Sequence, residues 1–218
     1  MNNRFLITLL ILTTIIVGIF IFSKKDNKDS TTTKNIQPTN HIKGQGKSGV
    51  TLVEYGDFQC PACYQYEPMV RQIVDKYIDQ ITFQFRNFPL SSIHPNAFAA
   101  SRAAEAADKQ GKFWEMHDKL YETQDPSGKS SWNASSNPST FFHQFAKDLG
   151  LDVEKFKADY ASEQINSLIN ADLTEGKKIP VEGTPTFQLN GVKIENPRSF
   201  EDFAKLIDEA IKTKNSQQ

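Results

Sequence analysis

The chain has 218 residues, and its 25 basic and 26 acidic side chains leave a formal charge of −1 at neutral pH. This balance gives no electrostatic case for nucleic-acid binding, and the length allows one globular domain with a sizeable core. Only two cysteines are present, which excludes a scaffold built on several disulfides and a self-contained four-cysteine zinc site.

The first segment of the chain is apolar. Residues 5–22 carry no charge and approach the minimum length of a membrane-spanning helix, roughly 17–25 residues. The stretch ends in Phe-Ile-Phe-Ser-Lys-Lys, without the small residues of a cleavage site. We therefore expect a transmembrane anchor over 1–22, with a cleaved signal sequence as the alternative. Because the lysines after the stretch outnumber Arg4 before it, the positive-inside rule favours a cytoplasmic domain, whereas the chemistry predicted below requires the opposite side.

A polar stretch separates this segment from the rest. Residues 23–45 are rich in Lys, Asn, Asp, Ser, Thr and Gly, a composition that buries too little apolar surface to fold by itself. We predict a flexible linker here, whose last part, from about His41, is compatible with a short edge strand. The folded domain is expected over 46–218.

The domain begins with a predicted strand, helix and strand. Residues 50–58 are β-branched and aromatic with apolar positions throughout, as in a strand that is buried on both faces. Pro61 then opens a helix that runs to Tyr77, since proline fits the first helical position. Alternating apolar residues over 81–88 predict the second strand.

Helical spacing dominates the next part, so we expect a helical insertion at about 92–178. An exposed polar loop is predicted over 130–137. The apolar faces predict helices over 95–110, 113–121, 138–149 and 156–176.

The chain then returns to strands and ends in a helix. Residues 186–189 and 192–195 are predicted strands, and Asn190-Gly191 between them is typical of a type I′ hairpin turn. A final amphipathic helix is predicted over 199–210. The predicted order is thus β-α-β, a helical block, and β-β-α.

Both cysteines lie in one motif, Cys60-Pro61-Ala62-Cys63, where a predicted strand gives way to a helix. Free N–H groups and the helix dipole favour negative charge at a helix N-terminus, so Cys60 is the candidate thiolate and Cys63, one turn inside, the shielded thiol. Half of a zinc site is the main alternative, but the four histidines are not in paired metal spacing. A structural disulfide would close too small a loop to add much order. We expect no metal site.

A second element precedes the strand at 186–189, as Gly183-Thr184-Pro185-Thr186. Taken alone, Pro185 reads as a turn proline at a strand start. Coupled with the cysteine motif, a cis Thr184–Pro185 bond would turn the backbone toward the thiols and leave the main chain of Thr184 free to pair with an extended substrate.

Other side chains near the motif are weaker candidates. Glu54 lies in the predicted buried strand, where a carboxyl group is a candidate for a raised pKa, although Glu54 or Asp57 could instead face solvent. Phe58 and Tyr64 flank the thiols and could line a hydrophobic peptide groove. His117 is interpreted as a packed core residue and His94 as a helix-entry residue.

With these motifs in place, the chain resembles the thioredoxin superfamily, and specifically the DsbA-like thiol-disulfide oxidoreductases of bacterial cell envelopes. The matching stretches are 50–63, 85–97, 103–122 and 183–191. The resemblance implies an α/β thioredoxin fold with an inserted helical domain, here preceded by the anchor and linker.

The resemblance also assigns roles to residues. It implies that Cys60 is the attacking thiol, Cys63 the resolving thiol and Pro185 the cis-proline, while Glu54 occupies the position of a buried acid thought to relay protons. Ala62 stands where enterobacterial relatives have histidine, so strong oxidising power is not implied. We expect substrate contacts at Thr184, Pro185, Phe58, Pro61 and Ala62.

The predicted function is therefore a membrane-tethered, extracytoplasmic enzyme that introduces disulfides through Cys60 and Cys63 without a diffusible cofactor. Its expected partners are exported or secreted cysteine-containing proteins and a membrane reoxidant of the DsbB or vitamin-K-epoxide-reductase-like type. The alternatives are an envelope thiol reductant or isomerase, a non-enzymatic peptide-binding or chaperone module, and a metal-binding envelope protein.

Overall fold

The computed structural model describes residues 36–125, 127, 129 and 131–217. The predicted anchor over 1–22 and the linker up to residue 35 lie outside the described residues. Among the residues that are described, no helix is both long enough and apolar enough to cross a membrane.

A five-stranded mixed sheet forms the centre of the domain, in the order β1-β3-β2-β4-β5. The strands are β1 (His41–Lys43), β2 (Val50–Gly56), β3 (Ile81–Asn87), β4 (Thr186–Leu189) and β5 (Val192–Lys193). β2 runs parallel to β3 and antiparallel to β4. With a neighbour on each side, β2 is the central strand, and its residues are almost all buried, as the apolar sequence predicts.

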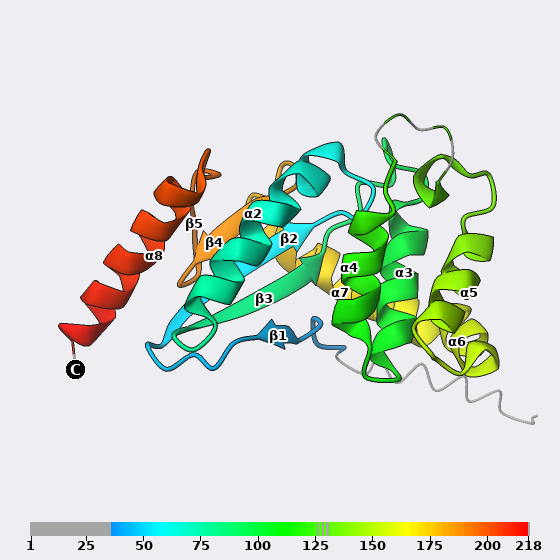
Figure 1. Cartoon of the computed structure of the whole chain (residues 1–218), viewed down its shortest axis with the longest axis horizontal. Helices are drawn as coiled ribbons and strands as arrows, with labels where there is room; N and C mark the ends of the chain where they lie inside the picture. The colour runs from blue at the N-terminus through cyan, green and yellow to red at the C-terminus, as the bar shows by residue number, and fades with distance from the viewer. Residues whose placement is uncertain (1–35, 126, 128, 130, 218) are drawn as a thin grey trace, which may run out of the picture. The chain divides into compact units, whose positions relative to one another are not determined.

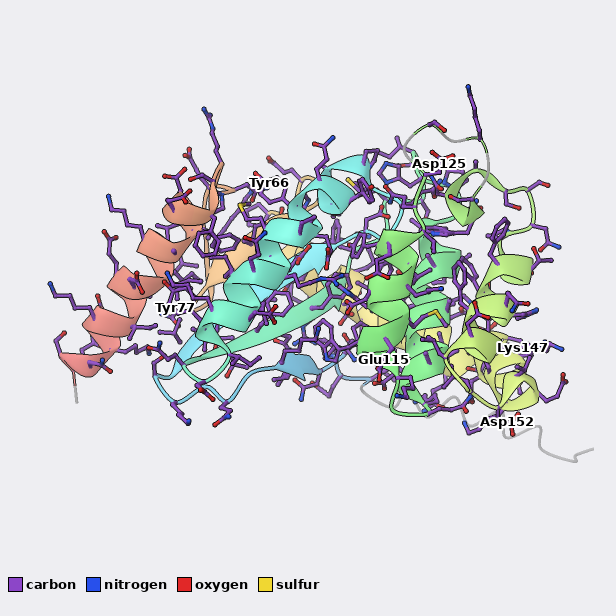
Figure 2. All side chains as sticks on the ribbon, viewed as in Figure 1. Tyr66, Tyr77, Glu115, Asp125, Lys147 and Asp152 are labelled. Carbon is purple, nitrogen blue, oxygen red and sulfur yellow. The ribbon has the colours of Figure 1, made fainter. Side chains whose placement is uncertain are left out.

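Helices cover both faces of the sheet (Figure 1). On one face, α2 (Pro61–Tyr77) and α8 (Phe200–Asn215) share a core with Leu52 and Phe187 of the strands. Tyr77, labelled in Figure 2, joins these helices, since its hydroxyl donates to Asp208 Oδ1 of α8 at 2.7 Å. On the other face, Tyr55 belongs to a smaller cluster that packs against α7 (Glu163–Lys178). The alternation of neighbouring β2 side chains between these cores is the normal result of strand geometry.

Apart from α7, the helices between β3 and β4 gather at the end of the sheet opposite α8 (Figure 1). Alanines line the buried face of α3 and let neighbouring helices approach closely. Besides α7 and a 3₁₀ turn at Trp132–Ala134, the helices are α3 (Ala97–Asp108), α4 (Phe113–Glu122), α5 (Ser139–Asp148) and α6 (Val153–Tyr160). The order β-α-β, helical block, β-β-α agrees with the prediction.

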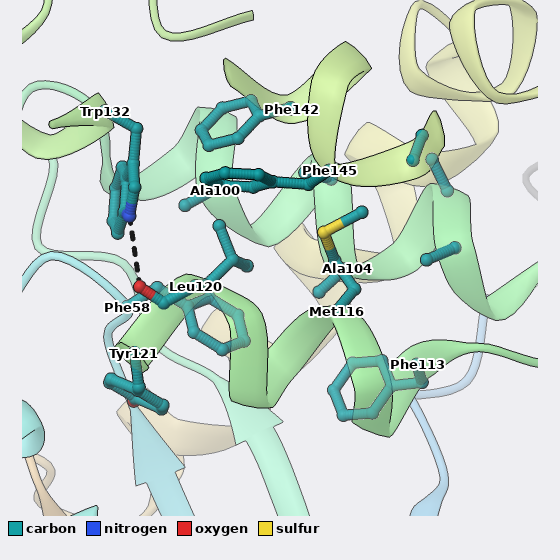
Figure 3. Close-up of a cluster of buried hydrophobic side chains, with 14 of the residues drawn as sticks. Phe58, Ala100, Ala104, Phe113, Met116, Leu120, Tyr121, Trp132, Phe142 and Phe145 are labelled. Carbon is teal, nitrogen blue, oxygen red and sulfur yellow. Dashed lines mark hydrogen bonds between the residues drawn. The ribbon is translucent and has the colours of Figure 1, made fainter. Parts of the chain in front are cut away.

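Three details of the prediction are wrong. Trp132, in the predicted exposed loop, is fully buried, and its indole N–H donates to Leu120 O at 3.0 Å (Figure 3). The predicted helix over 156–176 is interrupted, because the Ser162 hydroxyl accepts from Ile165 N and caps the start of α7. β5 is only Val192–Lys193, and both residues are exposed.

The segment before β2 is tied to the domain. β1 forms within the stretch assigned to the linker, at His41, where an edge strand was compatible with the sequence. It pairs with β3, and just before it Thr39 donates from its backbone N and its hydroxyl to the Asp172 carboxyl of α7, at 2.8 and 2.7 Å. Thr39 is buried, so the folded domain begins before residue 45.

Candidate active site

Cys60 lies at the junction of the central strand and the following helix. β2 ends at Gly56, a turn follows, and Cys60 is the N-cap of α2 with extended backbone angles (φ −68°, ψ 123°). Its N–H donates to Asp57 O at 3.0 Å, which closes the turn. Pro61 occupies the first turn of α2, where its missing N–H costs nothing. The sulfur therefore stands among the free N–H groups at the helix start.

The two thiols have opposite acidities. Hydrogen bonding from the Cys63 side chain, helped by the Thr184 side chain and by the N–H groups of Cys63 and Ala62, outweighs burial and lowers the pKa of Cys60 from 9.0 to about 5. Burial raises the pKa of Cys63 well above 9.0, and the charges of Cys60 and Glu54 raise it further. At neutral pH Cys60 is thus a thiolate and Cys63 a thiol, which are the states that disulfide exchange needs.

A loop from the far end of the chain completes the site. The Thr184–Pro185 peptide bond is cis, and Thr184 O accepts from the protonated Cys60 Sγ at 3.3 Å. Two hydrogen bonds hold this loop in place. Asn196 Nδ2 donates to Pro185 O at 2.7 Å, and within the loop Thr186 Oγ1 donates to Gly183 O at 2.7 Å. The structure therefore brings together the two motifs that the sequence singles out.

Glu54 is buried on the face of β2 that α2 covers. It is only 4% exposed, and no hydrogen bond to its carboxyl group is formed by the residues that the structure describes. Burial, and to a lesser extent the charge of Glu67, raises the pKa of Glu54 from 4.5 to about 8. The alternative that Glu54 or Asp57 faces solvent is wrong, since Asp57 is 0% exposed.

Two side chains that the sequence interpretation missed hold the turn before Cys60. The carboxylate of Asp57 accepts from Gln59 N at 2.8 Å, Leu90 N at 2.9 Å and His94 Nδ1 at 2.7 Å. The Gln59 side chain accepts from Asn96 N at 2.6 Å and donates to a backbone oxygen of the helical insertion at 2.8 Å. These bonds anchor the active-site turn to the insertion. The available signal was the presence of polar residues on both sides of Phe58.

Both the sequence and the fold are similar to those of known proteins. A family model described as thioredoxin matches residues 36–209. A probable disulfide bond formation protein D of Bacillus anthracis is 29% identical over 202 residues, which cover 91% of each chain. The structure of alpha-DsbA1 from Wolbachia pipientis superposes with a TM-score of 0.69 at 19% identity, covering 86% of this chain and 99% of that one.

The chain belongs to the thioredoxin family.

A thioredoxin-like α/β fold with a helical insertion is thereby confirmed, and so is the resemblance to DsbA-like proteins. The family domain also occurs within larger proteins. The Na⁺/H⁺ antiporter NhaA 3 of Salinispora tropica is 36% identical over 171 residues, which are 78% of this chain and 24% of the antiporter. The chain thus spans about a quarter of the length of these relatives.

The thioredoxin-family site differs from the sequence prediction at Phe58. Phe58 was expected to contact substrate, but it is fully buried, and its ring packs against Phe85, His117 and Tyr121. The reason is that Phe58 lies just past the central strand, where its ring packs into the core between the sheet and the helical insertion. Pro61 is exposed, while Ala62 and Thr184 are half-buried and Pro185 is buried. His117 is a core residue, as predicted.

One group among the described residues has the composition of a metal site. Glu67, His117 and Asp118 offer ligand atoms that all lie within 4.8 Å of one another. The Arg71 guanidinium already lies 2.9 Å from Glu67 and 3.9 Å from Asp118, so its positive charge occupies the surroundings that a cation would need. The two cysteines are not part of this group.

Proposed function

We propose that this protein is an extracytoplasmic thiol-disulfide oxidoreductase that introduces disulfides into exported proteins through Cys60 and Cys63. One observation carries the proposal. The pKa of Cys60 is lowered to about 5 while that of Cys63 is raised by burial. A low pKa stabilises the reduced form of the pair and makes Cys60 a good leaving group, which favours transfer of the disulfide to a substrate. The likeness to a disulfide bond formation protein along 91% of both chains supports this direction.

In the proposed reaction, a substrate thiolate attacks Cys60 Sγ of the disulfide form. A mixed disulfide forms, the Cys60–Cys63 bond breaks, and Cys63 leaves with the electron pair and takes up a proton. A second substrate thiolate then attacks the substrate sulfur of the mixed disulfide and releases Cys60 as a thiolate. Two electrons pass from the substrate to the cysteine pair, and the substrate gains a disulfide. Glu54 is the proposed proton donor to Cys63.

Substrate binding is proposed at the surface around Cys60. The Thr184 backbone, beside the cis bond, would pair with an extended substrate segment, with Pro185, Pro61 and Ala62 around it. The protein is further proposed to be a single-pass membrane protein, with an anchor over 1–22 and a linker that ends before the buried Thr39 of the folded domain. A membrane reoxidant of the DsbB or vitamin-K-epoxide-reductase-like type would restore the disulfide.

The reduction potential of the Cys60–Cys63 pair, measured against glutathione, tests the direction of transfer. A value of about −120 mV is expected for a disulfide donor, whereas a value of about −270 mV would establish a reductant instead. Cys60→Ser should abolish disulfide formation in cells, while Cys63→Ser should trap the mixed disulfide. Full function of Cys60→Ser would assign the protein to the non-enzymatic peptide-binding class. Protease accessibility on intact cells tests the extracytoplasmic placement.

A further inference from the structure

Tyr121 carries a buried hydroxyl group on the inner side of the two cysteines. It belongs to α4, is 2% exposed, and lies in the same buried cluster as Cys60 and Cys63. Phe58 and His117 pack against its ring, with ring centroids at 5.2 and 5.0 Å, and Figure 3 shows Tyr121 with Phe58. Because the ring is held on these sides, it has little freedom to turn its hydroxyl elsewhere.

The hydroxyl oxygen of Tyr121 lies next to the end of β2. A Cβ atom placed on Gly56, the last residue of this strand, would be 3.3 Å from Tyr121 Oη and would clash with the ring of Phe85. The following residue, Asp57, donates its N–H to Cys63 Sγ at 3.5 Å. The Tyr121 hydroxyl and the Cys63 sulfur therefore lie beside consecutive residues of the chain, and the missing side chain of Gly56 leaves the room for this approach.

This hydroxyl group has no hydrogen bond in the dithiol form. Among the residues that the structure describes, none donates to Tyr121 Oη or accepts from it. A buried phenol normally has a partner, and an unmet one costs folding free energy. Burial and, after it, the charge of Cys63 raise the pKa of Tyr121 well above its ordinary value. The O–H group thus stays protonated at neutral pH and is an unused donor beside a sulfur whose charge changes in the reaction.

We propose that the Tyr121 hydroxyl donates a hydrogen bond to Cys63 Sγ whenever this sulfur becomes a thiolate during disulfide exchange. The inference rests on the proposed function, because it concerns the departure of Cys63 from the Cys60–Cys63 bond. A neutral thiol is a weak acceptor, whereas a thiolate is charged and forms a stronger bond with a donor. The donor therefore fits the transient state better than the resting one, and such differential binding accelerates a reaction.

The step balances without a proton from Tyr121. A substrate thiolate attacks Cys60 Sγ and forms the mixed disulfide, the Cys60–Cys63 bond breaks, and Cys63 leaves with the electron pair. The phenol donates a hydrogen bond to this thiolate and keeps its proton, because burial raises its pKa. Closure of a mixed disulfide by Cys63 passes through the same transition state in reverse. The hydroxyl therefore speeds opening and closure equally and leaves the reduction potential unchanged.

Tyr121→Phe removes only the oxygen atom and tests the proposal. The disulfide form of the full-length protein is mixed with reduced glutathione, and opening of the Cys60–Cys63 bond and its closure from the glutathione mixed disulfide are followed. Each is expected to slow about 10-fold, at the low end of what a hydrogen bond to a charged group contributes. Attack of Cys60 on oxidised glutathione, in which Cys63 does not react, should keep its rate.

Tyr77→Phe is the matched control. Tyr77 is also a buried tyrosine, but its hydroxyl donates to Asp208 Oδ1 at 2.7 Å and to Ala204 O at 3.2 Å. Its urea midpoint should fall, because these bonds are lost, while its exchange steps keep the wild-type rates. Tyr121→Phe should show the reverse, with slower opening and closure and a urea midpoint that does not fall, because the dithiol form loses no hydrogen bond.

Glu54→Leu separates a direct action on Cys63 from an action through the neighbouring carboxyl group. Leucine accepts no hydrogen bond, so Tyr121→Phe should slow opening by the same factor in the Glu54→Leu background as in the wild type. Loss of the effect in that background would overturn the proposal, because the hydroxyl would then act on Glu54.

Two further results would also overturn it: opening and closure in Tyr121→Phe at the wild-type rates, or an equal slowing of the step in which only Cys60 reacts. Failure of the oxidase assignment is a separate result. It would appear in the wild-type reduction potential, which Tyr121→Phe is not expected to change.

Discussion

Asp172 and Glu105 on the one hand and Glu54 on the other are buried carboxyl groups beside the central strands with opposite surroundings. Asp172 is fully buried and accepts from Thr39, from Asn87 N at 2.9 Å and from Arg86 Nη1 at 3.4 Å. Glu105, 1% exposed, lies 2.7 Å from His41 Nε2 and 2.7 Å from Asn87 Nδ2.

Glu54 has the same burial without these partners. Burial raises the pKa of Asp172, but hydrogen bonds from Thr39 and Asn87 oppose that shift. At Glu54 burial and the charge of Glu67 act in the same direction. The difference teaches that a satisfied buried carboxylate ties elements together, whereas an unsatisfied one is ready to exchange a proton near pH 7.

Asp172 and Glu105, together with their hydrogen-bond partners, form what we call the satisfied cluster. The largest expected effect comes from breaking it. Asp172→Ala should lower the free energy of unfolding by about 3–5 kcal/mol, because it leaves Arg86 and Asn87 with unmet bonding needs in a buried site. Urea unfolding at neutral pH measures the loss. The control is Asp79→Ala. The Asp79 side chain is 60% exposed beside Lys47, so its removal should change the free energy of unfolding by less than about 0.5 kcal/mol. Equal losses in the two variants would contradict the distinction.

Glu54→Gln should have the opposite sign. The pKa of Glu54 is raised from 4.5 to about 8, so its stabilising neutral form is fully present below pH 4.5 and is lost as the pH rises through 8. Glutamine keeps the group neutral, and the variant should be more stable than wild type by about 2–4 kcal/mol at pH 8–9. The gain should vanish near pH 4.5. A constant gain at all pH values would show that titration is not its cause.

His41→Gln should remove a pH dependence from the satisfied cluster. Although burial opposes it, hydrogen bonds with Asp108 and Glu105 raise the pKa of His41 from 6.5 to about 9. Its contribution is therefore complete below pH 6.5 and is lost as the pH rises through 9. We expect a loss of about 2 kcal/mol at pH 6, shrinking toward zero above pH 9. His143→Gln is the control, because His143 has no such acidic partner at hydrogen-bond distance within the described residues and burial lowers its pKa.

The smallest effect is expected at the rim of the same cluster. Asp108 lies 3.5 Å from His41 Nδ1, but its side chain is 44% exposed. Asp108→Asn should cost less than about 1 kcal/mol, because water screens the pair. Thermal unfolding beside Asp172→Ala gives the comparison, and a loss as large as that of Asp172→Ala would mean that burial does not set the strength of these contacts.

Local patterns in the sequence were enough for much of this structure. Period-2 and helical spacing identified the strands and most helices, and Pro61 located the start of α2. The approach of Thr184 to Cys60 also followed from the two motifs. Because β4 is antiparallel to β2, the start of β4, which Thr184 precedes, lies beside the end of β2, which Cys60 follows.

Long-range pairings were beyond those patterns. Trp132 stands among polar residues, so its burial depends on the helices around it, as Figure 3 shows. The bonds of Asp57 to His94 and of Asp172 to Thr39 join residues far apart in the chain. A pattern of neighbours in sequence contains no information about such partners, which is why the satisfied acidic cluster was missed while the lone carboxyl of Glu54 was found.

The position of the two cysteines in one turn has a thermodynamic consequence. A bond between Cys60 and Cys63 closes a loop so short that it hardly restricts the unfolded chain. A large difference in unfolding free energy between the dithiol and disulfide forms therefore comes chiefly from contacts in the folded protein around the Cys60 sulfur. Equilibrium unfolding of both forms would then measure the redox preference of the folded pair relative to the same pair in the unfolded chain.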